Sequence, residues 1–206
     1  MRWGLSILLA AILTGSSFAL DPDPVHLADP RDIAAVYAAL LHGSAAFTNL
    51  GRNQNQCWAV VDTTVNFDDM NPKLAPDAQL RAPSSDPKPF QEALADFDAR
   101  KYQRVTLPPS NSSQYVMVSP DEADAFRASR TAATAGGSGQ RYAGCGGVTY
   151  FSDVYFSAKR TAALVYMLNW CGSLCGQGEW VYLEKRDGQW ILRSGQAGIV
   201  SGAKPF

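Results

Sequence analysis

The chain has 206 residues, of which 46% are hydrophobic and 18% are charged. This length and composition suit one domain with a sizeable core, and they exclude an intrinsically disordered chain and a multi-span membrane protein. Eighteen Lys and Arg residues oppose nineteen Asp and Glu residues, so the chain has no strong field to attract nucleic acid or an anionic membrane. The charge balance therefore indicates no particular partner, and we expect no nucleic-acid binding.

Residues 1–19 have the features of a secretory signal peptide. Arg2 precedes an apolar run, and Ser17 and Ala19 are small residues at the two positions that a signal peptidase reads. The apolar run is too short to span a membrane, and no cysteine follows it to carry a lipid. We expect a secreted or periplasmic protein with no stable membrane anchor after cleavage, and an uncleaved anchor is the alternative. Residues 20–29 are then a flexible lead-in, and residues 30–206 form a single domain.

The first predicted elements are one helix and one strand. Asp29 can cap a helix and Pro30 suits its first position, and apolar residues recur at helical spacing up to Gly43. These signals predict a helix over residues 30–42. Residues 57–65 are rich in β-branched side chains and predict a buried strand.

The middle of the chain alternates loops with short elements. Residues 68–89 contain five prolines, which predicts a long surface loop. A short helix is expected over residues 90–97 and a short strand over residues 115–118. Residues 119–130 begin with a capping box and predict a second long helix, and the glycine-rich residues 135–147 predict a flexible connector.

The C-terminal part predicts four consecutive strands, over residues 148–157, 161–171, 175–186 and 189–194. Asp187 and Gly188 between the last two are the preferred residues of a type I′ turn. The predicted fold is α+β in a single domain. A four- to five-stranded antiparallel sheet, which ends in a C-terminal β-meander and includes the strand at 57–65, packs against two or three helices.

The predicted register gives the C-terminal sheet one aliphatic and one aromatic face. Turns at residues 158–159, 172–174 and 187–188 align Val154, Ala163, Leu183 and Leu192 on the first face. The second face carries three rows: Phe151, Tyr166 and Trp180; Asp153, Leu164, Tyr182 and Arg193; and Tyr155, Ala162, Glu184 and Ile191.

Two interpretations of the aromatic face remain open. In the first, the helices at 30–42 and 119–130 cover it, and Asp153 pairs with Arg193 across the sheet. In the second, the face is a partly open cup with aromatic walls and convergent polar groups. The residues that would bind a ligand there are Asp153, Tyr166, Trp180, Tyr182, Glu184 and Arg193.

Cys57, Cys145, Cys171 and Cys175 predict two disulfides in an oxidising compartment. If residues 172–174 form a three-residue hairpin loop, Cys171 and Cys175 lie opposite each other at a Cα separation of about 4.5 to 5.5 Å. Cys57 and Cys145 would then close a loop of roughly 90 residues, which stabilises the fold by about 4 to 5 kcal/mol. A redox-active pair is the alternative at Cys171 and Cys175, although the spacing is not that of a thioredoxin motif.

Four motifs of the C-terminal part resemble those of a known family. Residues 151–156, 163–166, 171–178 and 183–190 carry the patterns S-x-V-x-F, A-L-V-Y, C-G-x-L-C-G-x-G and L-x-K-x-x-G-x-W. In these patterns, roughly the last 60 residues resemble an uncharacterised family of exported bacterial proteins. Tyr155 stands where that family commonly has glycine, and Cys145 is an additional cysteine. The resemblance implies no activity and supports the predicted sheet.

Few side chains are available for catalysis. His26 lies in the lead-in and His42 at a helix end, and no sequence spacing indicates a metal site, a nucleotide loop or a nucleophile elbow. We therefore predict no catalytic residues, no metal and no cofactor. The favoured function is an exported non-catalytic domain that binds a small ligand or protein partner on the aromatic face. The alternative is a small, glycosidase-like hydrolase that uses Asp153 and Glu184 as its carboxylate pair.

Overall fold

The computed structural model describes residues 29–43, 58–70, 73–109, 115–131, 145–172 and 175–199. The predicted signal peptide, most of the lead-in, Cys57 and most of the glycine-rich connector lie outside the described residues. The side chains of Cys171 and Cys175 lie outside them as well.

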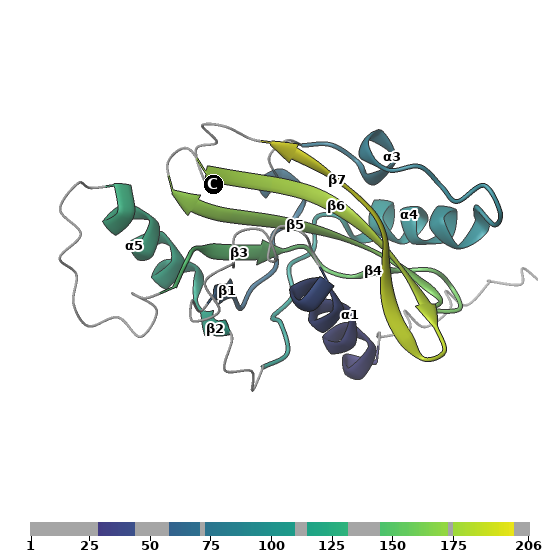
Figure 1. The fold of residues 1–206 in the computed structure, drawn as a ribbon, viewed down its shortest axis with the longest axis horizontal. Coiled ribbons are helices and arrows are strands. Elements are labelled where there is room, and N and C mark those ends of the chain that lie inside the picture. Colours follow the sequence, from purple (N-terminus) through teal and green to yellow (C-terminus); the bar gives the residue numbers. More distant parts are fainter. Residues whose placement is uncertain are drawn as a thin grey trace, which may run out of the picture.

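The described elements form one α+β domain around a seven-stranded sheet, as the sequence predicts in outline (Figure 1). The strands are β1 (Trp58–Val61), β2 (Tyr115–Val118), β3 (Val148–Phe151), β4 (Tyr155–Phe156), β5 (Ala162–Gly172), β6 (Cys175–Arg186) and β7 (Gln189–Ile199). Their order across the sheet is β2-β1-β3-β5-β6-β7, and β4 pairs with β5. The β-meander of β5, β6 and β7 is confirmed.

The sheet is mixed, and the prediction of a purely antiparallel sheet is wrong. β1 is parallel to both β2 and β3, whereas the neighbouring pairs β3–β5, β5–β6 and β6–β7 are antiparallel. The connection from β1 to β2 contains a long helix, and a strand that returns through such a crossover lies parallel to the first. The sheet is also larger than expected because β2 extends it at one edge and β4 adds a short pairing with β5.

The helices are α1 (Pro30–Gly43), α3 (Pro76–Gln79), α4 (Lys88–Arg100) and α5 (Pro120–Thr131), and η1 (Phe67–Asp69) is a short 3-10 turn. The start of α1 is as predicted, because the Asp29 carboxylate accepts the N–H of Arg31 at 2.9 Å. The capping box of α5 is also confirmed, since Ser119 and Glu122 exchange hydrogen bonds at 3.2 and 2.8 Å. α4 is longer than expected and reaches Arg100.

Helices cover both faces of the sheet. α4 and α5 pack on the aromatic face through Phe90, Phe97 and Phe126. α1 packs on the aliphatic face, where Val36 and Leu40 join a second core cluster, so the prediction that α1 covers the aromatic face is wrong. α1 lies on the aliphatic face because its apolar side chains pack there. Val36 and Leu40 are buried in one cluster with Ala163, Val165, Val181 and Leu183. Figure 1 shows α1 and α4 on opposite sides of the sheet, with α5 at the end away from the β6–β7 hairpin.

The predicted register holds between β5 and β6, holds only in part between β6 and β7, and fails before β5. Between β6 and β7, Leu183 pairs with Leu192 as expected, but a bulge then pairs Tyr182 with Ser194 instead of Arg193. Leu164 pairs with Tyr182 and Tyr166 with Trp180, as expected. Phe151 pairs with Met167 instead of Tyr166, which moves Phe151 to the aliphatic cluster. The reason is an irregular stretch between β3 and β4 and a longer connection before β5, whose Arg160 has a positive φ of 52°. The hairpin after β5 differs too, because Gly172 rather than Cys171 pairs with Cys175.

Candidate functional site

The predicted aromatic cup is the core of the protein. Tyr166 and Trp180 have no exposed surface and Tyr182 is 1% exposed. The ring of Phe97 from α4 meets that of Trp180 edge-on at 5.2 Å, and the ring of Phe90 meets that of Tyr182 at 5.4 Å. A ligand can reach these rings only by displacing α4, so the open-cup interpretation is wrong.

Asp153 is buried and held by a helix instead of by the sheet. Arg100, in the last turn of α4, donates hydrogen bonds to the carboxylates of Asp96 and Asp153 and, at 2.8 Å, to the carbonyl of Val154. Burial raises the pKa of Asp153, and the charge of Arg100 opposes this shift. The predicted pair of Asp153 with Arg193 is therefore wrong, because the chain leaves the regular sheet between β3 and β4 and turns this carboxylate toward α4.

Glu184 belongs to a different group of charges. It accepts hydrogen bonds from Arg193 at 2.9 Å and from Arg186 at 3.0 Å. Burial and the nearby charge of Glu184 raise the pKa of Tyr182 to about 12. The structure thus brings together Glu184, Arg193 and Tyr182 as predicted, but it places Asp153 and Glu184 with separate arginines. It does not support a paired-carboxylate hydrolase.

A pocket of about 120 Å³ lies elsewhere, at the carboxyl ends of the parallel strands β1 and β2. Its lining residues are Val61, Thr63, Val65, Asp69, Arg104, Pro120, Asp124, Arg127 and Tyr150. Val61 ends β1, and Pro120 lies just beyond β2. The carboxyl edge of parallel strands is a frequent place for ligand sites, because the loops and helices that follow the strands meet there.

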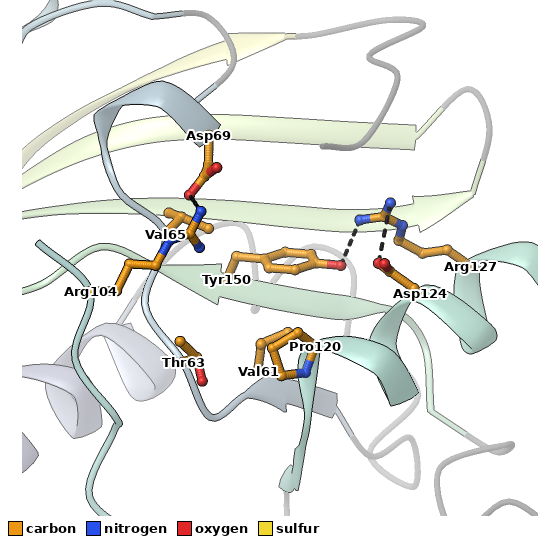
Figure 2. A pocket seen from close by; sticks show the side chains of 9 residues that line it. All are labelled: Val61, Thr63, Val65, Asp69, Arg104, Pro120, Asp124, Arg127 and Tyr150. Carbon is orange, nitrogen blue, oxygen red and sulfur yellow. Dashed lines mark hydrogen bonds and ion pairs between the residues drawn. The ribbon is translucent and has the colours of Figure 1, made fainter. Parts of the chain in front are cut away.

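The pocket combines an apolar floor with charged ends. Val61 and Val65 are buried, and the ring of Tyr150 lies between the two ends (Figure 2). At one end Arg104 forms an ion pair with Asp69. At the other end Arg127 donates a hydrogen bond to the hydroxyl of Tyr150 at 2.8 Å and faces Asp124 at 3.5 Å.

Local structure fixes the position of both buried charges. Asp69 is the last residue of the capping box of η1, and its carboxylate accepts the N–H of Asn66 at 3.0 Å. Arg127 lies in the second turn of α5, and its guanidinium packs over the Tyr150 ring at 5.8 Å. Burial raises the pKa of Tyr150, and the charge of Arg127 opposes the shift. The phenol is therefore a neutral hydrogen-bonding group across the physiological range.

Sequence reasoning missed this pocket entirely. The order of strand 57–65, helix 90–97 and strand 115–118 is a β-α-β pattern, which predicts parallel neighbours and a site at their carboxyl edge. The prediction that strand 57–65 belongs to an antiparallel sheet does not take this pattern into account. No sequence signal links Asp69, Arg104 and Arg127, which come from three separate segments.

Of the four cysteine side chains, the structure describes that of Cys145. Cys145 is fully buried and disulfide-bonded. The side chains of the other three cysteines lie outside the described residues, so the pairings of Cys57 with Cys145 and of Cys171 with Cys175 stay predictions.

Searches for other kinds of site and for relatives gave no match. In the described part of the chain, no group of three or more His, Cys, Asp or Glu residues could hold a metal ion. No helix among these residues is long and apolar enough to cross a membrane. Comparisons with protein-family models, curated proteins and solved structures found nothing similar to this chain. The resemblance to an exported bacterial family therefore remains a prediction from the sequence motifs.

Proposed function

We propose that this protein is an exported, non-catalytic domain that binds a small polar molecule in the pocket lined by Asp69, Tyr150 and Arg127. The observation that carries the proposal is the pocket itself, which joins buried apolar residues to fixed charges at the carboxyl edge of parallel strands. Export is supported by the signal-like residues 1–19 and by the even number of cysteines.

Binding fits this pocket better than catalysis does. Both carboxylates among its described lining residues are paired with arginines, and none of these lining residues is a histidine or cysteine that could act as base or nucleophile. Arginine and a neutral phenol are instead groups that orient a polar ligand through hydrogen bonds.

The volume limits the size of the ligand. An apolar cavity of about 150 Å³ accommodates benzene, so a pocket of about 120 Å³ suits a compound of about six non-hydrogen atoms or fewer. The best small ligands gain at most about 1.5 kcal/mol per non-hydrogen atom. A ligand of about six such atoms therefore binds with a Kd no lower than about 0.3 μM.

A ligand screen by thermal unfolding tests the proposal. Metabolite-sized polar compounds at about 100 times their Kd stabilise the folded full-length chain by about 2.7 kcal/mol, which raises Tm by about 5 to 10 °C. Thr63→Phe fills the pocket from its lining, and Thr106→Phe is the matched control, because Thr106 faces Thr63 in an isolated bridge but does not line the pocket.

We expect at least one compound to raise the Tm of the unaltered protein and of Thr106→Phe, but not of Thr63→Phe. A shift that persists in Thr63→Phe would place binding elsewhere, and the absence of any shift across the screen would refute the binding function.

A further inference from the structure

The two ion pairs of the pocket differ in which member is the less exposed. At the α5 end the cation is buried, since the side chain of Arg127 is 10% exposed and that of Asp124 is 65% exposed. At the η1 end the anion is buried, since the side chain of Asp69 is 16% exposed and that of Arg104 is 49% exposed. The pocket thus has a buried positive charge at one end and a buried negative charge at the other.

The exposed member of each pair is the one that a ligand can replace. Asp124 and Arg104 are in contact with water, so they can turn outward when a ligand supplies the counter-charge that the buried partner needs. The buried members cannot move in the same way. Asp69 is tied to the backbone of η1, and Arg127 is tied to the hydroxyl of Tyr150.

A ligand that satisfies both buried charges must carry both signs itself. We propose that the ligand is a small zwitterion, a short amino acid whose carboxylate binds Arg127 and Tyr150 and whose ammonium group binds Asp69. The carboxylate accepts charge-assisted hydrogen bonds from the guanidinium. The ammonium group donates to Asp69, whose carboxylate has further acceptor capacity beyond Asn66 and Arg104.

The middle of the pocket suits the short apolar part of such a molecule. The ring of Tyr150 lies between the two charged ends, and the side chains of Val61 and Val65 line the same pocket (Figure 2). A methylene chain can cross this floor, where it contacts the apolar side chains of Val61 and Val65.

This inference rests on the proposed function, and binding of matched probes to the unaltered full-length protein tests it first. Glycine, β-alanine and 4-aminobutanoate carry both charges at increasing separation. Propanoate and butanoate lack the ammonium group, and propylamine and butylamine lack the carboxylate. By calorimetry, we expect one of the three amino acids to bind at least ten-fold tighter than every singly charged probe.

Variants of the inner and outer members of the ion pairs provide the second test. Arg127→Gln and Asp69→Asn remove the groups that hold the ligand and should weaken binding of the best amino acid at least ten-fold. Asp124→Asn and Arg104→Gln remove the competing partners and should leave its affinity unchanged or improve it. Far-ultraviolet circular dichroism and Tm verify that each variant is folded.

Three results would overturn the inference. The first is a singly charged probe that binds as tightly as the best amino acid. The second is an outer variant that loses as much affinity as the inner ones. The third is a ligand from the thermal screen that Thr63→Phe excludes and that is not a zwitterion, in which case the pocket remains a binding site for another class of molecule. If no compound of any class binds, the proposed function fails as well.

Discussion

Arg100 in the last turn of α4 donates a hydrogen bond to the buried carboxylate of Asp153, 53 residues later in the chain. The same guanidinium holds Asp96 on its own helix and the carbonyl of Val154. Asp96 in turn accepts the N–H of Phe156 at 2.8 Å. This network fastens the end of α4 to the irregular connection between β3 and β4, and so keeps the helix over the aromatic core.

We expect Arg100→Met to destabilise the protein by about 3 kcal/mol at neutral pH, because it leaves the buried carboxylate of Asp153 without its cation. Denaturant unfolding of the two proteins measures this difference. Arg186→Met is the matched control, because Arg186 is largely exposed and pairs with Glu184 at the surface, where such pairs contribute less than about 1 kcal/mol. Equal losses in the two variants would show that the Arg100 network adds nothing beyond a surface pair.

The raised pKa of Asp153 predicts a pH dependence of stability. Above the ordinary value of 3.8 the unfolded chain releases this proton first, while the folded protein retains it, so the folded state binds more protons. The contribution of Asp153 is therefore fully present below pH 3.8 and is lost as the pH rises through the folded pKa. Asp153→Asn lacks this contribution.

Unfolding free energies of the unaltered protein and of Asp153→Asn between pH 3.5 and 7 provide the measurement. Titrating groups outside the Arg100 network affect both proteins alike, so the difference between the two reports on Asp153 and its neighbours in that network. We expect the stability of the unaltered protein relative to the variant to fall as the pH rises. A constant or rising difference would contradict the raised pKa.

The sequence predicted most elements because their signals are local. The cap at Asp29, the capping box before α5 and the turn at Asp187 and Gly188 each depend on neighbouring residues. The register between β5 and β6, and that between β6 and β7 close to their turn, followed from short turns in the same way. The failures involve longer connections, since the stretch between β3 and β4 shifted Phe151 to the other face and the crossover through α4 made β1 and β2 parallel.

The candidate site was missed for the same reason. The aromatic residues Tyr166 and Trp180 share a face as predicted, but which helix covers that face depends on packing between distant segments. The sequence predicts a short helix over residues 90–97, and only the structure shows that its Phe90 and Phe97 pack against the sheet. The β-α-β order of the elements points to the carboxyl edge of β1 and β2, but no local pattern shows that Asp69, Arg104, Arg127 and Tyr150 meet there.

Phe97 is the central contact between α4 and the sheet. Its ring meets the rings of Tyr155 and Trp180 edge-on, each at 5.2 Å, and it is almost fully buried. We expect Phe97→Ala to destabilise the protein by about 3 to 5 kcal/mol, because it removes a large buried ring and leaves a cavity. Thermal and denaturant unfolding measure this loss.

Tyr102→Ala is the matched control for Phe97→Ala. Tyr102 follows α4 closely and also contacts an aromatic ring, that of Phe67 at 6.3 Å, but it is 59% exposed. Its loss should cost less than about 1 kcal/mol, since little apolar surface returns to water. A similar cost for both substitutions would mean that α4 is not anchored through Phe97.

A substitution in the β6–β7 turn measures how much backbone conformation contributes to stability. Asp187 and Gly188 both have positive φ, 49° and 80°, as the type I′ turn predicted from the sequence requires. A Cβ atom added at Gly188 meets no other atom within 4 Å. Gly188→Ala should therefore destabilise the protein by about 1 kcal/mol through backbone strain alone, which lowers Tm by about 2 to 4 °C. Asp187→Asn should change Tm by much less, because asparagine tolerates a positive φ. A Tm unchanged by Gly188→Ala would mean that the turn adopts another conformation in solution.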